Sequence, residues 1–163
     1  MNSEARQFEQ RHFIEDVALF YEHEGLPRMA GRILGWLLIC DPPHQSPDEL
    51  AEVLQASKGS ISTMTRLLIQ MDLVERIGLP GQRRDYFRLK PGGWSQMIRQ
   101  EAFKASTMRQ LAERGRGLLE NQEPELGKRL EELCCLYAFL AKEYTALFER
   151  WERKCQAATR KRR

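Results

Sequence analysis

The 163-residue sequence predicts a mainly α-helical chain that carries one small β-hairpin. Apolar residues recur at steps of three and four over most of the chain, which is the spacing of amphipathic helices. Residues 73–89 instead combine two β-prone runs with a Gly/Pro turn between them. An apolar content of 42% and a charged content of 30% are typical of a soluble globular protein, and the chain is long enough to bury a core.

Two helices are expected before residue 45. The first begins at Asn2 or Ser3 and ends near Glu24, and its apolar face consists of Phe8, Phe13, Val17, Phe20 and Tyr21. Gly25 and Pro27 separate it from a second helix whose inward residues are Met29, Ile33, Leu34, Leu37 and Leu38. This second helix ends at Asp41-Pro42-Pro43, because proline supplies no N–H and restricts the residue before it.

A pair of short helices follows. Ser46-Pro47-Asp48-Glu49 places a cap, a proline and two acids at a helix start, where the helix dipole favours negative charge. Ser57 caps the next helix, whose apolar stripe is Ile61, Met64, Leu68 and Met71. The other side of that helix carries hydrogen-bond donors, namely Lys58, Ser60, Ser62, Thr63 and Arg66.

The hairpin comes directly after these helices. Leu73, Val74 and Ile77 predict one strand, and Tyr86, Phe87 and Leu89 predict the returning strand. The turn contains Gly78, Pro80 and Gly81, and its tip carries Gln82, Arg83 and Arg84. Helix, turn, helix and hairpin together form a winged helix-turn-helix, in which one helix fits a major groove about 12 Å wide and the hairpin reaches the neighbouring backbone.

These residues resemble a known family. The run DELAEVLQASKGSISTMTRLLIQMDLVERI resembles the MarR-type transcriptional regulators, and the wing GLPGQRRDYFRL resembles their GbsR-like branch, with its Pro-Gly-x-Arg-(Arg/Lys)-x-Tyr-(Phe/Tyr) pattern. The resemblance implies a DNA-binding regulator, a repressor, that dimerises through its N- and C-terminal helices. It also implies a small-molecule effector bound between the dimer helices and the winged unit, in a branch associated with choline and betaine metabolism.

Beyond the boundary at Lys90-Pro91-Gly92-Gly93 the pattern is purely helical, with one helix over 94–120 and another from Pro124. The last helix carries an unbroken heptad seam of Leu126, Leu130, Leu133, Tyr137, Leu140, Tyr144, Leu147 and Trp151. Packing against the 94–120 helix explains part of this seam, and a homodimer interface is the favoured interpretation. The expected organisation is therefore 1–45 for N-terminal support and dimerisation, 46–90 for DNA binding, and 91–163 for dimerisation, with a basic tail.

Charge is segregated along the chain, as an anionic polymer partner requires. Residues 58–90 contain seven basic and three acidic residues, and residues 150–163 contain seven basic and one acidic. A homodimer would present two recognition helices to a palindromic operator in double-stranded DNA. The predicted DNA contacts are Ser57, Lys58, Ser60, Ser62, Thr63, Arg66, Gln82, Arg83 and Arg84, with Asp85 expected to orient one of the wing arginines. Exposed polar residues on an ordinary helix and turn are the alternative for each position.

Four aromatic residues, Phe20, Tyr21, Trp36 and Trp94, could cage a quaternary ammonium effector by cation–π attraction, although aromatics on apolar faces are more often core residues. No enzyme is predicted, since His12, His23 and His44 lie in no catalytic arrangement. The spacing of the four cysteines is not that of a zinc site, and this holds for Cys40, Cys134, Cys135 and Cys155. They are therefore interpreted as idle thiols or as a redox switch. We expect no cofactor and no metal.

The sequence contains no signal peptide and no apolar run long enough to span a bilayer, so a cytoplasmic location and no membrane partner are expected. The competing non-enzyme interpretation is a winged-helix module that binds protein without specific DNA binding. The two arginines at the wing tip argue against it, because apolar residues would suit a protein partner better at that place.

Overall fold

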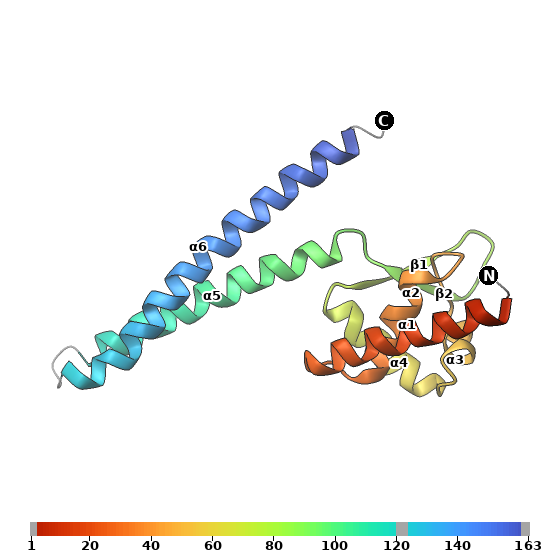
Figure 1. Cartoon of the computed structure of the whole chain (residues 1–163), viewed down its shortest axis with the longest axis horizontal. Coiled ribbons are helices and arrows are strands. Elements are labelled where there is room, and N and C mark those ends of the chain that lie inside the picture. The colour runs from red at the N-terminus through yellow and green to blue at the C-terminus, as the bar shows by residue number, and fades with distance from the viewer. Residues whose placement is uncertain (1–2, 120–123, 161–163) are drawn as a thin grey trace. The chain divides into compact units, whose positions relative to one another are not determined.

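The computed structural model describes residues 3–119 and 124–160, and it confirms a mostly helical chain with one small antiparallel sheet (Figure 1). The chain forms two compact units, Met1–Gly93 and Trp94–Arg163, and each is described by itself. The N-terminal helices and the winged helix-turn-helix belong to the same unit. Within the described residues no helix has the length and apolar character needed to cross a membrane.

Helices α1 (Ser3–His23) and α2 (Arg28–Ile39) pack against each other at close range (Figure 1). Two glycines of α2 permit this approach: a Cβ on Gly31 would lie 2.7 Å from Ala18 Cα, and one on Gly35 would lie 3.1 Å from Ile14 Cα. Glu15 of α1 also pairs with Arg28 at 2.9 Å and with Arg32 at 2.5 Å. The helix pair is therefore fixed by both backbone contact and charge.

The face that α1 buries is narrower than the sequence suggests. Ile14 and Ala18 are buried and Val17 and Tyr21 pack against the core, whereas Phe8, Phe13 and Phe20 are exposed by 61%, 39% and 61% of their surface. On α2, Leu38 was expected to point inward and this prediction is wrong, since 44% of its surface is exposed. The core contacts only the side of α2 that carries Ile33, Leu34 and Leu37.

Helices α3 (Pro47–Val53) and α4 (Lys58–Gln70) begin at the predicted caps. Ser46 Oγ accepts a hydrogen bond from Glu49 N at 3.3 Å, while Ser46 N donates to the Glu49 carboxylate at 2.7 Å, which completes a capping box. Ser57 Oγ accepts from Ser60 N at 3.1 Å. Leu50, Ile61 and Leu68 then bury the inner faces of both helices, so α4 is held with its opposite side outward.

Strands β1 (Val74–Gly78) and β2 (Asp85–Leu89) form the wing and pair antiparallel, with Val74 opposite Leu89 and Gly78 opposite Asp85. Gly81 adopts φ +76° in the turn between them. An isolated bridge from Gln45 to Phe87 joins β2 to the segment before α3. Tyr86 and Phe87 are both buried, so the base of the wing is part of the core of this unit.

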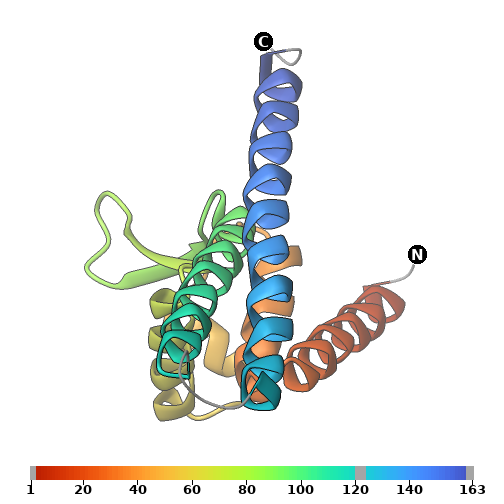
Figure 2. The ribbon, with the colours of Figure 1, turned by 90° about the vertical axis from the view of Figure 1, so that its left-hand side faces the viewer.

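The second unit is an antiparallel pair, α5 (Gly93–Gly117) and α6 (Pro124–Arg160), whose helices run side by side in Figure 2. Arg99 pairs with Glu152 at 3.6 Å and lies 4.5 Å from the centre of the Phe148 ring. Near the other end, a Cβ on Gly115 would lie 3.2 Å from Leu130 Cδ1. These contacts set the register of the two helices.

The heptad seam of α6 is only half covered by α5. Five of its residues are partly buried, namely Leu130, Leu133, Tyr137, Leu140 and Tyr144. Leu147 and Trp151 remain exposed by 43% and 46%, and Leu136 and Phe139, outside the seam, by 50% and 60%. The side chain of Leu126 lies outside the described residues. Packing within the unit thus uses one edge of the seam and leaves a broad apolar face beside it.

Candidate nucleic-acid interface

Helix α4 presents a polar face away from the core. Ser62, Thr63 and Arg66 are exposed, on the side opposite the buried residues Ile61 and Leu68. Arg66 Nε donates to the Ser62 carbonyl oxygen at 3.1 Å, which lays the arginine along the helix and leaves its terminal nitrogens available. Side chains at these positions can meet base edges when the helix enters a major groove.

At the N-terminus of α4, the side chains of two predicted phosphate contacts, Ser57 and Lys58, already form bonds within the chain. Ser57 is exposed but its hydroxyl already caps the helix, and Ser60 is half-buried. Lys58 Nζ pairs with Asp48 of α3 at 2.6 Å. The hydrogen bond from Lys58 lowers the pKa of the Asp48 carboxyl below its ordinary value. Lys58 therefore bridges the two helices, and this partner was not foreseen from the sequence.

The two wing arginines differ in their surroundings. Arg83 is exposed at the turn and forms no ion pair with any part of the chain that the structure describes, and Gln82 beside it is exposed as well. Arg84 instead folds back: its Nε donates to Tyr86 Oη at 2.7 Å, and its guanidinium carbon lies 5.1 Å from the centre of the Tyr86 ring. Arg84 also reaches Glu49 of α3 at 3.6 Å.

The ion pair between Arg84 and Glu49 is supported by the pKa shifts of both groups. The hydrogen bond to Tyr86 raises the pKa of the Arg84 guanidinium, and the hydrogen bonds from Ser46 lower the pKa of the Glu49 carboxyl, so both charges are retained. Glu49 thereby serves the cap of α3 and the wing at once. Arg84 thus links the hairpin to the helix-turn-helix, and its direct contact with DNA stays a prediction.

The prediction that Asp85 orients Arg83 or Arg84 is wrong, because Asp85 pairs with Arg76 of β1 at 3.2 Å. Arg88 pairs with Glu75 at 2.7 Å across the same hairpin, and Lys90 pairs with Asp72 at 2.5 Å. Of these pairs, only Arg88 and Glu75 are directly opposite in the register, whereas Arg76 and Asp85 are diagonal and Lys90 and Asp72 flank the strands. The sequence positions alone do not reveal these partners. Among the seven basic residues of 58–90, all of which the structure describes, only two carry no ion pair: Arg66 and Arg83.

A hollow of about 440 Å³ joins α4 to the wing. Its wall is made by residues from α4, from the wing and from the start of α3, namely Pro47, Ser62, Thr65, Arg66, Ile69, Arg76, Asp85 and Phe87. Thr65 was not singled out from the sequence; it is buried, and its hydroxyl donates to the Ile61 carbonyl at 2.8 Å. The polar face of α4 and the hairpin therefore form one concave surface, which Arg66 lines, whereas Arg83 lies in the turn of the hairpin.

The first unit by itself brings together only part of the predicted aromatic cage. Phe20 and Tyr21 contact each other, with ring centres 5.2 Å apart. Trp36 does not join them, because the close approach of Gly35 to Ile14 places it about two helical turns further along α1. Trp94 belongs to the other unit. Burial also raises the pKa of the Cys40 thiol, which suits an idle cysteine.

Similarity to known proteins covers both units. A family model described as MarR family matches residues 24–85, and a model described as MmpR5-like MarR family transcriptional regulator matches residues 92–154. The HTH-type transcriptional regulator MmpR5 of Mycobacterium tuberculosis (strain ATCC 25618 / H37Rv) is 41% identical over 128 residues, which is 78% of this chain and 78% of that protein. A crystal structure of a transcriptional regulator aligns with a TM-score of 0.75 and 37% identity, over 89% of this chain and 99% of that one.

Proposed function

The chain belongs to the MarR family of DNA-binding transcriptional regulators, and we propose that it acts as a homodimeric repressor that binds a palindromic operator. In this proposal α4 enters the major groove and the wing tip lies against the neighbouring backbone or minor groove. Two protomers would place their α4 helices about 34–36 Å apart, one turn of the duplex.

The observation that supports the proposal is the concave surface between α4 and the wing, which Arg66 lines, together with the exposed Arg83 in the turn of the wing. Arg66 is proposed to read a guanine, since a guanidinium can donate to O6 and N7 together. Ser62 and Thr63 lie on the same face and complete the base-reading set. Arg83 is proposed to bind a phosphate or lie in a narrow minor groove.

The remaining predicted contacts have supporting roles. Ser57, Lys58 and Ser60 lie at the start of α4, where unpaired N–H groups favour a phosphate. Gln82 flanks Arg83 in the turn and can donate to the backbone. Arg84 is proposed as a positioning residue, because its hydrogen bond to Tyr86 and its ion pair with Glu49 hold the wing against α3.

Dimerisation is proposed to use the exposed apolar faces of the terminal helices. Leu136, Phe139, Leu147 and Trp151 expose large apolar surfaces on α6, and Phe8 and Phe20 do so on α1. A stable monomer rarely leaves so much apolar surface uncovered, so a second copy is the natural partner. The half-buried heptad residues would then form the edge of the interface, beside the contact with α5.

Three finer predictions belong to this proposal. Assignment to the GbsR-like branch depends on the wing pattern alone, while the family model that matches 92–154 is the MmpR5-like one. A response to a small molecule stays a prediction, with no support from the aromatic residues. A regulator of transcription needs access to the chromosome, so the cytoplasmic location stays a prediction.

A gel-shift titration in 100 mM KCl, with DNA from upstream of the protein's own gene, tests the proposal. We expect a specific complex that resists excess unrelated duplex, and a double variant, Arg66→Ala with Arg83→Gln, that loses most of this preference. Equal affinity of the double variant and the wild type would contradict the proposed surface. Sedimentation of the free protein as a monomer at micromolar concentration would contradict the homodimer.

A further inference from the structure

The hollow between α4 and the wing lies on the path that one DNA strand takes under the proposed function. In a duplex, a sugar-phosphate strand separates the major groove from the minor groove. With α4 in the major groove and the hairpin at the minor groove, that strand has to cross between the two elements. The hollow of about 440 Å³ is the concave surface found there, so the groups that line it decide which part of the strand fits.

Most of the surface inside the hollow is apolar. Ile69 contributes a half-buried side chain from the last turn of α4, and Phe87 adds a ring from β2, with 8% of its surface exposed. Pro47 adds its ring from the first turn of α3. A phosphate is disfavoured on such a surface, because a charge that leaves water without a partner is costly, whereas the carbon atoms of a deoxyribose are compatible with it.

The polar side chains deep in the hollow already have partners within the chain. Thr65 is buried, and its hydroxyl donates to a backbone carbonyl of α4 at 2.8 Å. Arg76 and Asp85 pair with each other at 3.2 Å, so the two charges cancel. Arg66 is the remaining charge of the wall, and its terminal nitrogens are assigned to the bases. A hydroxyl group that enters the hollow would therefore lose its water without gaining an equal partner.

From these observations we propose that the hollow seats one deoxyribose of the operator strand and excludes a substituent on its 2′ carbon. The sugar lies on Ile69 and Phe87, and the phosphates on either side of it stay outside in water. Asp85 supports this placement, because a carboxylate in the wall repels a phosphate. Ile69 is the residue that determines specificity for the sugar, since its side chain fills the space that a 2′ group would need.

This inference deepens the proposed function and rests on it, because a strand crosses the hollow only when α4 and the wing hold a duplex. It adds a discrimination that the other contacts do not provide. Arg66 is proposed to read a base and Arg83 to bind a phosphate, and neither group senses the sugar. The 2′ position is where a protein can distinguish DNA from RNA.

Fluorescence anisotropy with the full chain and modified operator duplexes tests the seat. In the operator that the gel-shift experiment delimits, one nucleotide at a time carries a 2′-O-methyl group, at the same place in both half-sites. We expect one or two adjacent nucleotides per half-site at which this group weakens binding at least about tenfold, because it overfills the hollow. A 2′-fluoro group there favours the same sugar pucker without the bulk and should change affinity less than about twofold.

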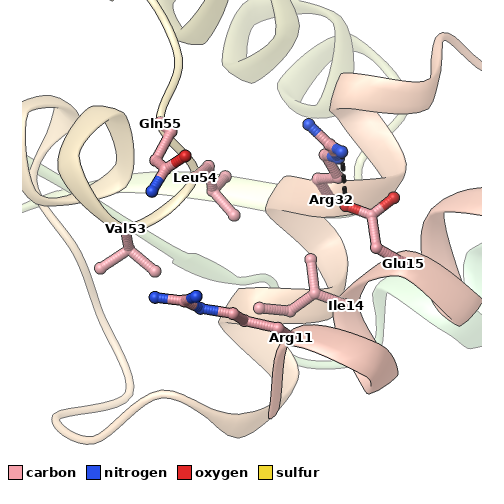
Figure 3. Close-up of a pocket in the computed structure, with 7 residues that line it drawn as sticks. All are labelled: Arg11, Ile14, Glu15, Arg32, Val53, Leu54 and Gln55. Atoms are coloured by element: carbon pink, nitrogen blue, oxygen red, sulfur yellow. Dashed lines mark ion pairs between the residues drawn. The ribbon is translucent and has the colours of Figure 1, made fainter. Parts of the chain in front are cut away.

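Replacement of Ile69 locates the seat. Ile69→Ala makes room for the added methoxy group, so the tenfold penalty of the wild type should fall to about twofold, with Ile69→Val between them. Loss of stability cannot produce this recovery, because each variant is compared on modified and unmodified duplexes. Val53→Ala is the matched control: it shortens an aliphatic side chain that lines a different hollow of the same unit, formed by α1, α2 and the end of α3 (Figure 3), and should keep the full penalty.

Three results would overturn this inference while leaving the proposed function intact. They are specific binding of the unmodified operator with no sensitive nucleotide in the scan, equal losses from the 2′-fluoro and 2′-O-methyl groups, and equal penalties in Ile69→Ala and Val53→Ala. A sensitivity to deoxyuridine in place of thymidine that Ile69→Ala abolishes, with none to the sugar groups, would assign the hollow to a thymine methyl instead. Absence of any specific complex with the unmodified operator is the failure of the proposed function, and the inference falls with it.

Discussion

Replacement of each wing arginine separately tests the different roles proposed for them. Arg83 has no ion pair among the described residues, whereas Arg84 is held by Tyr86 and Glu49. If Arg83 neutralises one phosphate, Arg83→Gln reduces the slope of log affinity against log salt by about 0.9 per wing. A dimer has two wings, so the slope changes by about 1.8.

That slope can be converted into a measurable ratio. Between 50 and 200 mM salt, a change of about 1.8 in slope is a factor of roughly 12. The affinity loss caused by Arg83→Gln should therefore be about twelvefold larger at 50 mM than at 200 mM. Arg84→Gln should cause a loss that is nearly the same at both salt concentrations, because it loosens the hairpin and its charge is already balanced by Glu49.

Fluorescence anisotropy with a labelled operator duplex, measured at four salt concentrations, gives both slopes. Arg83→Lys is the matched control for charge and should retain the wild-type slope. Tyr86→Phe removes the hydroxyl that accepts from Arg84 and should resemble Arg84→Gln, with reduced affinity and an unchanged slope. The reasoning is refuted if Arg84→Gln flattens the slope as much as Arg83→Gln does, or if Arg83→Gln leaves the slope unchanged.

Three further predictions concern base reading, assembly and acid stability. Arg66→Ala should relax preference at one symmetric operator position, measured by binding to a set of single-base variants; a uniform loss over all of them would remove Arg66 from the base readers. Phe139→Glu should shift the protein toward monomer in sedimentation, whereas Ala138→Glu, which adds the same charge to an exposed neighbouring position, should not; equal shifts would argue against the Phe139 face. The pKa of Glu15 lies below its ordinary 4.5, so its contribution to stability is complete above that pH and is lost as the pH falls through the folded value. Melting temperatures of Glu15→Gln should accordingly depend less on pH below 4.5 than those of the wild type, and parallel curves would contradict this.

The helix starts and the hairpin could be predicted because their signals are local. Ser46 and Ser57 cap their helices through atoms three residues away, and a Gly/Pro turn between two β-prone runs specifies a hairpin without help from the rest of the chain. The polar side of α4 was equally accessible, since a buried stripe at helical spacing defines the opposite face. The candidate residues therefore lie on the helix and the hairpin that the sequence predicts.

Features that depend on distant partners could not be predicted. Arg84 contacts Glu49, which lies 35 positions earlier in the sequence, and no local pattern distinguishes it from Arg83. Leu38 belongs to the apolar stripe of α2 by spacing, yet the neighbouring helices cover only part of that stripe. Gly31 and Gly35 did carry a signal, since two glycines four apart within a helix permit close approach of another helix.

The ion pairs also change what the charge count means. Residues 58–90 have a net charge of +4 by themselves, but α3 supplies Asp48 and Glu49 as partners for Lys58 and Arg84, while the three acids within the segment pair with three more cations. Two unpaired cations per protomer remain, Arg66 and Arg83. The pairs fix the wing and the start of α4 before DNA arrives, and this preorganisation lowers the ordering cost of binding.

This distribution sets an upper value for the salt dependence. Even if Arg66 met a phosphate instead of a base, two cations per protomer give four per dimer, and four neutralised phosphates correspond to a slope of about −3.6. The measurement should use a chain in which the four basic residues from 160 to 163 are replaced by glutamine, so that the tail adds nothing. If all seven basic residues of 58–90 contacted phosphates instead, the slope would approach about −12.6, which would require the ion pairs to open on DNA. A slope near the smaller value therefore means that the pairs persist in the complex and act as structure. A slope near the larger one means that all five acids, Asp48, Glu49, Asp72, Glu75 and Asp85, release their partners to the duplex.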